Sequence, residues 1–250
     1  MSDTMNNSMN NSMNNSRAGT GACPYNMNNS MSKNNSMNTA MNTVMSPTPN
    51  PPPSAFIHHL AIVETRKIGG GTRVWAWTHI QEDVAVGNYC NIGEHCFLEN
   101  GVIVGNQVVI KNGISLWQGI TVADHAFVGP HVIFTNERFP RSGFPKPYEP
   151  ITIEQGASIG AGSIIVPGIR IGCYATVGAG SVVTHHVPEH ALVFGNPARV
   201  QGWVCICGLR LKSDAPRGLT IAEGAASSCS LCECGRKYEI YREKCHLIAG

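Results

Sequence analysis

Two short cysteine turns near the C-terminus have the residue types and spacing of a metal site. Both read Cys-x-Cys-Gly: Cys205 and Cys207 open one, and Cys232 and Cys234 open the other, with 24 residues between the pairs. Four thiolates suit one tetrahedral zinc ion, and a closed four-thiolate shell predicts a structural site. Cys229 also forms a Cys-x-x-Cys pair with Cys232, so the choice between Cys229 and Cys234 stays open. The alternative is a set of reduced cysteines without metal.

A repeated run of small residues is the second feature with chemical potential. Ile159–Ser163 and Val177–Ser181 both read apolar-Gly-Ala-Gly-Ser and lie 18 residues apart. Stacked in register, they would present a flat strip of peptide groups with a repeat of about 4.8 Å. A long thin ligand could hydrogen-bond along that strip. The alternative is that the small residues only form tight corners.

Both runs belong to a pattern with a period of six. From Ile62 to Phe134 every sixth residue is apolar, thirteen positions in succession, and six further positions from Ile153 to Val183 continue the pattern. This period is neither helical nor alternating, and it predicts a solenoid with three short strands in each coil. With 18 residues a coil, the pattern predicts about six coils. Glycine follows eight of the positions, and we expect these glycines to turn corners with positive φ.

The break in the period indicates an inserted loop. The interval from Phe134 to Ile153 is nineteen, which is not a multiple of six. Prolines and basic residues are frequent in residues 135–150, which hold Arg138, Pro140, Arg141, Pro145, Lys146, Pro147 and Tyr148. A loop that leaves a regular solenoid often carries function, although it can also be a solvated excursion.

We expect three parts in the chain. Residues 1–56 repeat Met-Asn-Asn-Ser four times and then become proline-rich, which predicts a disordered tail and an extended linker. Residues 57–200 form the all-β solenoid, with its loop at 135–150. Residues 201–250 form a small zinc-ribbon-like segment, too short for a core of its own.

Charge and composition exclude several classes of protein. A net charge of +2 with 14% charged residues argues against an electrostatic nucleic-acid binder. No apolar run has the length of a membrane span, and the N-terminus lacks the apolar region of a secretory signal. Of the ten cysteines, three lie within the six-residue repeats, one lies in the N-terminal tail, and most of the others form close-spaced pairs near the C-terminus. This layout favours metal binding in a reducing compartment over disulfides, so we expect a cytoplasmic protein without membrane partners.

From Ile57 to Leu211 the sequence resembles the hexapeptide-repeat acyltransferases, whose fold is a left-handed parallel β-helix. Four segments carry the resemblance: Arg73–His79 (RVWAWTH), Gly129–Asn136 (GPHVIFTN), Phe139–Ser142 (FPRS) and Gly195–Arg199 (GNPAR). Together they resemble the branch that N-acetylates amino sugars linked to UDP or dTDP. The resemblance implies a homotrimer with active sites between subunits, acetyl-CoA as co-substrate and a nucleotide amino sugar as acceptor.

The resemblance also implies roles for single residues. In that branch the asparagine of Phe-Thr-Asn, here Asn136, lies by the reacting amine and would orient it. From the chemistry of amide formation we assign His131 as a base or a second orienting group, and the alternative is a solvent-facing corner histidine. Asn112 is a candidate for the sugar contacts. Arg138 and Arg141 on the loop are candidates for binding the diphosphate, and the alternative for these two is a solvated pair. Lys111-Asn112-Gly113 departs from the Gln-Asn-Asn of many relatives. The acetyl-CoA contacts are Gly160, Ala161, Gly178 and Ala179 along the strip, with Asn196 and Arg199 near the nucleotide end.

Two other functions use the same kind of solenoid. One is acyl transfer to a sugar hydroxyl or to an unrelated amine. The other is a carbonic anhydrase of the gamma class, which binds zinc with three histidines. His95 and His131 are 36 residues apart, hence two coils or about 9.6 Å. Two nitrogens on one zinc ion lie within about 4.2 Å of each other, so these two histidines do not suit a metal within one subunit.

Overall fold

The computed structural model describes residues 53–144, 146–212, 228–241 and 244–249, all within one compact unit. Within these ranges the chain forms strands and turns, with no helix. No helix that could span a membrane is found among the same residues. Residues 1–52 lie outside the described residues, and with them nearly all of the tail that the sequence predicts to be disordered.

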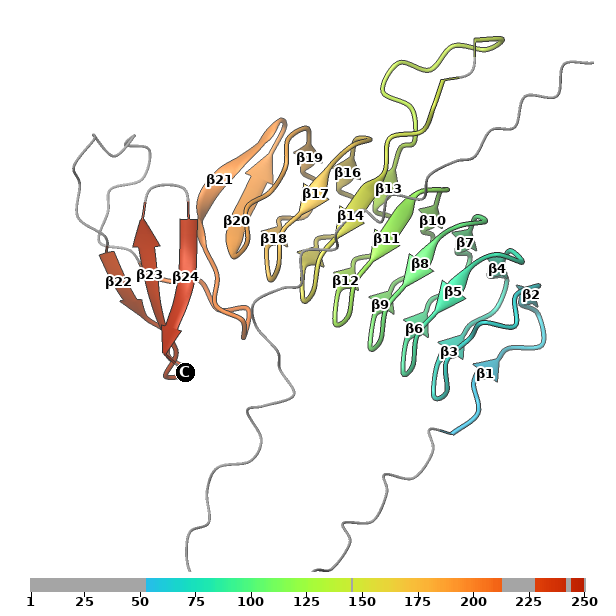
Figure 1. Cartoon of the computed structure of the whole chain (residues 1–250), viewed down its shortest axis with the longest axis horizontal. Coiled ribbons are helices and arrows are strands. Elements are labelled where there is room, and N and C mark those ends of the chain that lie inside the picture. The colour runs from blue at the N-terminus through green and yellow to red at the C-terminus, as the bar shows by residue number, and fades with distance from the viewer. Residues whose placement is uncertain (1–52, 145, 213–227, 242–243, 250) are drawn as a thin grey trace, which may run out of the picture. The chain divides into compact units, whose positions relative to one another are not determined.

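Three strands in each coil build a solenoid with three faces (Figure 1). Face 1 is a nine-stranded sheet whose last strand is antiparallel: β1 (Phe56–Ile57), β3 (Arg73–Val74), β6 (Asn91–Ile92), β9 (Val109–Ile110), β12 (Phe127–Val128), β15 (Ser158–Ile159), β18 (Thr176–Val177), β20 (Ala191–Gly195) and β21 (Ala198–Trp203).

Face 2 consists of two parallel sheets. The first holds β2 (Ile62–Val63), β4 (His79–Ile80), β7 (Phe97–Leu98) and β10 (Ser115–Leu116), and the second holds β13 (Ile133–Phe134), β16 (Ile164–Ile165) and β19 (Val182–Val183). Face 3 is one parallel sheet of β5 (Ala85–Val86), β8 (Ile103–Val104), β11 (Ile120–Val122), β14 (Ile151–Ile153) and β17 (Arg170–Ile171).

A separate antiparallel sheet follows near the C-terminus. It consists of β22 (Ser228–Leu231), β23 (Lys237–Tyr241) and β24 (Lys244–Ala249).

The core is a column of aliphatic side chains inside the coils. The apolar residues at every sixth place are called hexad positions. From Ile80 to Phe134 these residues are at most 4% exposed, as the period predicts. Parallel pairing at a spacing of 18, such as Val74 with Ile92 and Ile92 with Ile110, places each inward side chain above its counterpart. The stack therefore buries one continuous apolar column rather than a series of separate cores.

The two ends of the stack depart from the hexad count. Ile62, expected to point inward, is 60% exposed, because Val63 rather than Ile62 pairs with the buried Ile80. The first coil is one residue shorter than the others, so its phase shifts and the expectation for Ile62 was wrong. Face 1 contains eight parallel strands from β1 to β20, so the solenoid has about two coils more than the period predicts.

Turns between the faces form three ridges. Ridge 1 follows the strands of face 1, ridge 2 those of face 2 and ridge 3 those of face 3. The residue three places after the hexad position is left-handed in most turns, for example Gly113 (φ 73°) and His131 (φ 56°) on ridge 1. Ridge 2 is interrupted by the loop between β13 and β14, which leaves the stack (Figure 1).

The glycines directly after hexad positions are required for a different reason from the one expected. None of the eight has positive φ. A Cβ at Gly87 would lie 2.5 Å from the carbonyl oxygen of Gly105, and one at Gly160 would lie 2.5 Å from the nitrogen of Ala179. The close approach of the next coil therefore requires glycine here, and the expectation of a left-handed turn was wrong.

Candidate functional site

The two Gly-Ala-Gly-Ser runs stack in register on ridge 1. Ile159 pairs with Val177, and the N–H of Gly180 donates to the carbonyl of Ala161 at 2.9 Å. Ala161 and Ala179 are exposed, and a Cβ on the glycine after each would meet no atom within 4 Å. The side of the ridge at these coils is therefore bare backbone.

Ser163 and Ser181, at the end of each run, point away from this strip. Both are fully buried, and the hydroxyl of Ser163 donates to the carbonyls of Gly160 at 2.8 Å and Gly178 at 3.0 Å. The serines therefore tie neighbouring coils together from the inside. The ligand-binding capacity of the strip lies in its peptide groups.

At several other positions equivalent to that of Ala161, the N–H is bound by a side chain from a neighbouring coil. On ridge 3, Asn88 N–H donates to the side chain of Asn106 at 2.9 Å, and Asn106 N–H donates to Asp124 at 2.7 Å. A methyl group cannot accept a hydrogen bond, and within the described residues no acceptor faces the N–H of Ala161 or Ala179. Alanine at these two positions therefore leaves two peptide donors for a ligand.

The hairpin of β20 and β21 continues ridge 1 beyond the strip. A Cβ at Gly178 would lie 2.8 Å from Cβ of Phe194, so Phe194 covers the coil of Ala179. Asn196 lies on the exposed turn of this hairpin, and Arg199 is exposed at the start of β21, where it donates to the neighbouring Ala198 carbonyl at 2.9 Å. The six residues predicted to bind acetyl-CoA thus lie along one ridge.

His131 and Asn112 also lie on ridge 1, below the strip. His131 is exposed in the left-handed conformation, with its ring against Gly113. The side-chain oxygen of Asn112 accepts from the Glu94 N–H at 3.2 Å, so this oxygen already serves the turn. Gly113 separates His131 from His95, which stacks on Trp77 with ring centroids 4.8 Å apart.

Asn136 lies at the start of the loop on ridge 2, half buried. The preceding residues are held firmly: the Trp117 indole N–H donates to the Phe134 carbonyl at 2.7 Å, and Thr135 N–H donates to Ile165 at 3.1 Å. Face 2 divides into its two sheets between β10 and β13, and the Trp117 side chain spans that division. Asn136 thus follows a backbone segment that is held by hydrogen bonds, at the start of the loop.

The two loop arginines differ in their contacts. Arg138 donates to the Pro167 carbonyl at 3.0 Å and lies 3.8 Å from a carboxylate oxygen of Glu149, so it ties the loop to the solenoid. The Arg141 side chain is exposed. Of the two, Arg141 has the guanidinium that is more accessible to a diphosphate.

Within one chain, the candidate residues form two groups. His131 and the acetyl-CoA set lie on ridge 1, whereas Asn136, Arg138 and Arg141 lie on ridge 2. The strand β13 runs between His131 and Asn136, and five extended residues span up to roughly 16 Å. The two predicted catalytic residues therefore lie on different ridges of one protomer, on either side of β13.

Comparisons with known proteins support this geometry. Residues 67–100 match the model "Bacterial transferase hexapeptide (six repeats)", and residues 150–185 match "Hexapeptide repeat of succinyl-transferase". The chain is 47% identical over 187 residues to the dTDP-3-amino-3,6-dideoxy-alpha-D-galactopyranose 3-N-acetyltransferase of Aneurinibacillus thermoaerophilus, covering 74% of this chain and 91% of the relative. The chain belongs to the hexapeptide-repeat acyltransferases. Its fold is their left-handed parallel β-helix, and its branch is that of the nucleotide-amino-sugar N-acetyltransferases.

More distant similarities concern parts of this hexapeptide-repeat acyltransferase. A galactoside O-acetyltransferase of Lactococcus lactis subsp. lactis is 34% identical over 85 residues, 32% of this chain and 41% of that protein. The acetyltransferase domain of PglB from Neisseria gonorrhoeae, in complex with acetyl coenzyme A, gives a TM-score of 0.39 at 19% identity, covering 59% of this chain and 55% of that one.

Sequence reasoning missed two features of this hexapeptide-repeat acyltransferase. One is Trp117, whose indole supports the start of the loop. The other is a set of exposed aromatic side chains on the loop: Phe139 (68% exposed), Phe144 (73%) and Tyr148 (44%). A signal for the second was present, because three aromatic residues in a proline-rich excursion have no core to enter.

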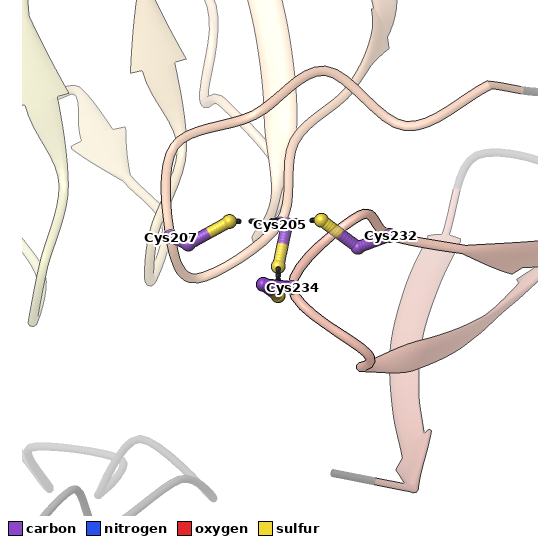
Figure 2. A group of neighbouring side chains, drawn as sticks. All are labelled: Cys205, Cys207, Cys232 and Cys234. Atoms are coloured by element: carbon purple, nitrogen blue, oxygen red, sulfur yellow. Dashed lines mark hydrogen bonds between the residues drawn. The ribbon is translucent and has the colours of Figure 1, made fainter.

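The cysteine cluster is the second candidate site, and it lies outside the acyltransferase ridges. The sulfur atoms of Cys205, Cys207, Cys232 and Cys234 all lie within 4.8 Å of one another (Figure 2). Cys229 lies in β22, opposite Glu239, and is not part of this group.

Electrostatics differ among the four thiols. The backbone N–H of Arg236 lowers the pKa of the exposed Cys234 thiol to about 6, so this thiol is ionised at neutral pH. Burial raises the pKa of Cys205 to about 12. A metal ion would have to displace the proton from Cys205, so binding would release protons.

Proposed function

We propose that this protein transfers the acetyl group of acetyl-CoA to the amino group of a dTDP- or UDP-linked amino sugar. The observation that carries the proposal is the relative with 47% identity, which this chain covers over 91% of its length and whose name specifies this reaction on a dTDP-amino sugar. The bare strip at Ala161 and Ala179 supports it independently, because its peptide donors suit the amide groups of a pantetheine arm.

The reaction needs little covalent participation by the protein. The amine nitrogen attacks the thioester carbonyl, the C–N bond forms, the C–S bond breaks, and CoA leaves as the thiol after the amine has lost a proton. Holding the two reactants together supplies up to roughly 7–11 kcal/mol in favourable cases. Asn136 orients the amine. His131 accepts the proton or provides a second orienting contact, worth about 10²–10⁴-fold as a general base.

The separation of the two groups of residues supports a homotrimer as part of the proposal. If ridge 1 of one protomer faces ridge 2 of the next, the acyl donor and Asn136 meet between subunits. The exposed aromatic residues of the loop, Phe139 and Phe144 among them, then have an apolar surface to cover. Arg141 of the same loop would reach the diphosphate of the acceptor.

The remaining parts of the proposal concern the metal and the compartment. One structural zinc ion binds at Cys205, Cys207, Cys232 and Cys234, away from the acyl-transfer site. Thiolate ligands require reduced cysteines, which supports the cytoplasm as the site of action.

The test is an assay of thiol release with acetyl-CoA and a panel of dTDP- and UDP-linked amino sugars. We expect one equivalent of free CoA thiol for each N-acetylated sugar, with at least one dTDP- or UDP-amino sugar preferred strongly over free amino sugars. Activity with none of the panel would reject the proposal.

A second candidate function is O-acetylation, which the partial match to a galactoside O-acetyltransferase favours. The same panel therefore includes the hydroxyl counterpart of each amino sugar. Product formed from the hydroxyl sugars but not from the amino sugars would establish the second function instead.

A further inference from the structure

The two cysteine turns are built in the same way. Cys205 N–H donates to the Leu209 carbonyl at 2.8 Å, and Cys232 N–H donates to Arg236 at 2.9 Å. In each turn a glycine N–H closes back on the first cysteine, Gly208 at 2.8 Å and Gly235 at 2.9 Å. Both glycines are left-handed, with φ of 87° and 90°. Each turn therefore presents two sulfur atoms from a backbone that is fixed by its own hydrogen bonds.

The two turns face each other through their sulfur atoms (Figure 2). Cys205 Sγ lies 3.4 Å from Cys234 Sγ, and Cys207 Sγ lies 3.6 Å from Cys232 Sγ. In a zinc tetrahedron with four thiolates, neighbouring sulfur atoms lie about 3.8 Å apart. The four side chains thus have nearly the spacing that such an ion requires.

Neighbouring donors suit a charged thiolate shell. The Tyr238 hydroxyl donates to Cys205 Sγ at 3.2 Å, and the Arg236 guanidinium donates to Cys234 Sγ at 3.4 Å. Hydrogen bonds to coordinating sulfur orient the ligands and reduce the excess negative charge of four thiolates around one divalent ion. The cluster therefore has outer contacts as well as ligands.

The cluster joins two elements that also share other contacts among the described residues. The Ile206 N–H donates to the Tyr238 hydroxyl at 2.9 Å. The three-stranded sheet of β22, β23 and β24 contacts the last coil through Tyr238, which packs on the buried His190 at 5.2 Å between ring centroids. Ser230 donates to the Lys212 carbonyl at 2.8 Å, while the ion pair of Lys212 with Glu233 is exposed and contributes little.

A sheet of this size needs support from outside itself, because three short strands bury too little apolar surface to be stable alone. Its buried residues Tyr238, Ile240 and Cys245 belong to the same core cluster as Trp203 of β21 and as Cys232, which follows β22. The sheet therefore covers the end of the apolar column, which a solenoid must shield from water.

We propose that a zinc ion held by Cys205, Cys207, Cys232 and Cys234 fastens this sheet as a cap on the last coil and thereby maintains the acyl-donor end of ridge 1. Cys205 follows β21 by two residues, and β21 pairs with β20 across the hairpin that carries Asn196 and Arg199. Loss of the ion releases the sheet and frees the Trp203 end of this hairpin. The link to acetyl-CoA rests on the proposed function, whereas the metal site and the cap do not.

The first experiment measures zinc in the purified full-length chain by mass spectrometry of the metal. We expect one zinc ion per chain, released when four thiols react with a mercurial reagent. Iron in place of zinc, disulfides among the four cysteines, or a chain without metal under reducing conditions would each overturn the proposal.

Variants then test the cap. Cys207→Ser and Cys234→Ser each remove an exposed ligand, and Cys229→Ser changes an exposed cysteine outside the cluster. We expect the two ligand variants to lose zinc, to melt several degrees lower and to release a C-terminal fragment faster in limited proteolysis. Cys229→Ser should match the wild type. Ligand variants with unchanged zinc content, or with unchanged melting temperature and proteolysis rate, would overturn the proposed cap. If a variant fails to fold, the same measurements are made on the wild-type chain after a chelator has removed its zinc.

The coupling to the acyl donor is read by equilibrium binding of CoA, which needs no acceptor. We expect zinc removal to raise the Kd for CoA at least threefold, and Cys229→Ser to leave it unchanged. If a zinc-free chain binds CoA with an unchanged Kd, the proposed coupling between the zinc site and the CoA site is wrong. If the chain binds zinc and the cap responds to its loss, but no sugar is acetylated, the proposed function is rejected and the zinc-fastened cap still stands.

Discussion

Left-handed residues on the ridges show how single positions acquire their rings. Among the described residues, eight other than glycine have positive φ, and five of these are histidine or tryptophan: Trp77, His95, His125, His131 and His190. Trp77, His95 and His131 are exposed, whereas His190 is buried. The exposure and orientation of His131 therefore follow from the solenoid geometry, and its chemical role rests on what faces it.

Asn136 is the residue whose loss should affect catalysis most. Asn136→Ala should lower kcat/KM by more than tenfold, because the amine loses its orienting contact while the firmly held backbone of Thr135 stays in place. Asn100→Ala is the matched control, since Asn100 has the same hexad position on ridge 2 two coils lower. Its side-chain oxygen accepts from the Asp83 N–H, and its own N–H donates to the side chain of Gln81, a contact that the substitution leaves in place. Steady-state kinetics give the answer, and full activity of Asn136→Ala would reject the role.

His190 should make stability depend on pH. Its ring is buried between Tyr174 and Tyr238, and burial lowers its pKa from 6.5 to about 4. Between these values the unfolded chain binds more protons than the folded chain, so stability is complete above pH 6.5 and falls as the pH drops toward 4. The loss should approach about 3 kcal/mol.

The variant His190→Asn removes this titration and keeps a residue that tolerates the left-handed conformation. Thermal melting at pH 7 and pH 5 should show a smaller decrease for the variant than for the wild type. Equal decreases would show that His190 does not cause the acid sensitivity.

At the scale of elements, the six-residue period predicted most of the fold, and its failures have local causes. Regular coils repeat one register, so a single period describes every inward side chain from Ile80 to Phe134. The first coil shifts phase by one residue, which exposes Ile62. The period alone did not reveal which ridge each candidate residue occupies. His131 lies on ridge 1 and Asn136 on ridge 2, so a shared active site requires ridges of two protomers in a trimer to face each other. The spacing of the cysteines, by contrast, predicted the four that cluster, and left only Cys229 open.

The bare strip on ridge 1 predicts a specific effect of proline. Ala161→Pro removes the N–H donor, and Pro130 has the same position in the coil below, so the ridge accommodates the ring. We expect the KM for acetyl-CoA to rise roughly five- to tenfold, because the complex loses one hydrogen bond that contributes about 1–1.5 kcal/mol to binding. Ala161→Gly, which retains the donor, should keep the wild-type KM. A proline variant with unchanged KM would exclude this N–H from binding.

At the scale of the whole molecule, a shared active site predicts complementation between defective protomers. A sample of Asn136→Ala and a sample of Ala161→Pro each have a defect in every site. After unfolding and refolding together, mixed trimers should contain some sites with both wild-type residues, and activity should exceed that of either sample refolded alone. Sedimentation should give a particle of three 26.8 kDa chains. A monomer, or mixtures without any gain, would contradict an interface site.

The most direct measurement is a crystal structure of the protein with CoA and a dTDP-linked amino sugar. The account predicts the pantetheine arm on ridge 1, with its carbonyl groups accepting from the N–H of Ala161 and Ala179, and the sugar amine beside Asn136 of an adjacent protomer. CoA bound on another ridge, or an amine remote from every Asn136, would contradict it.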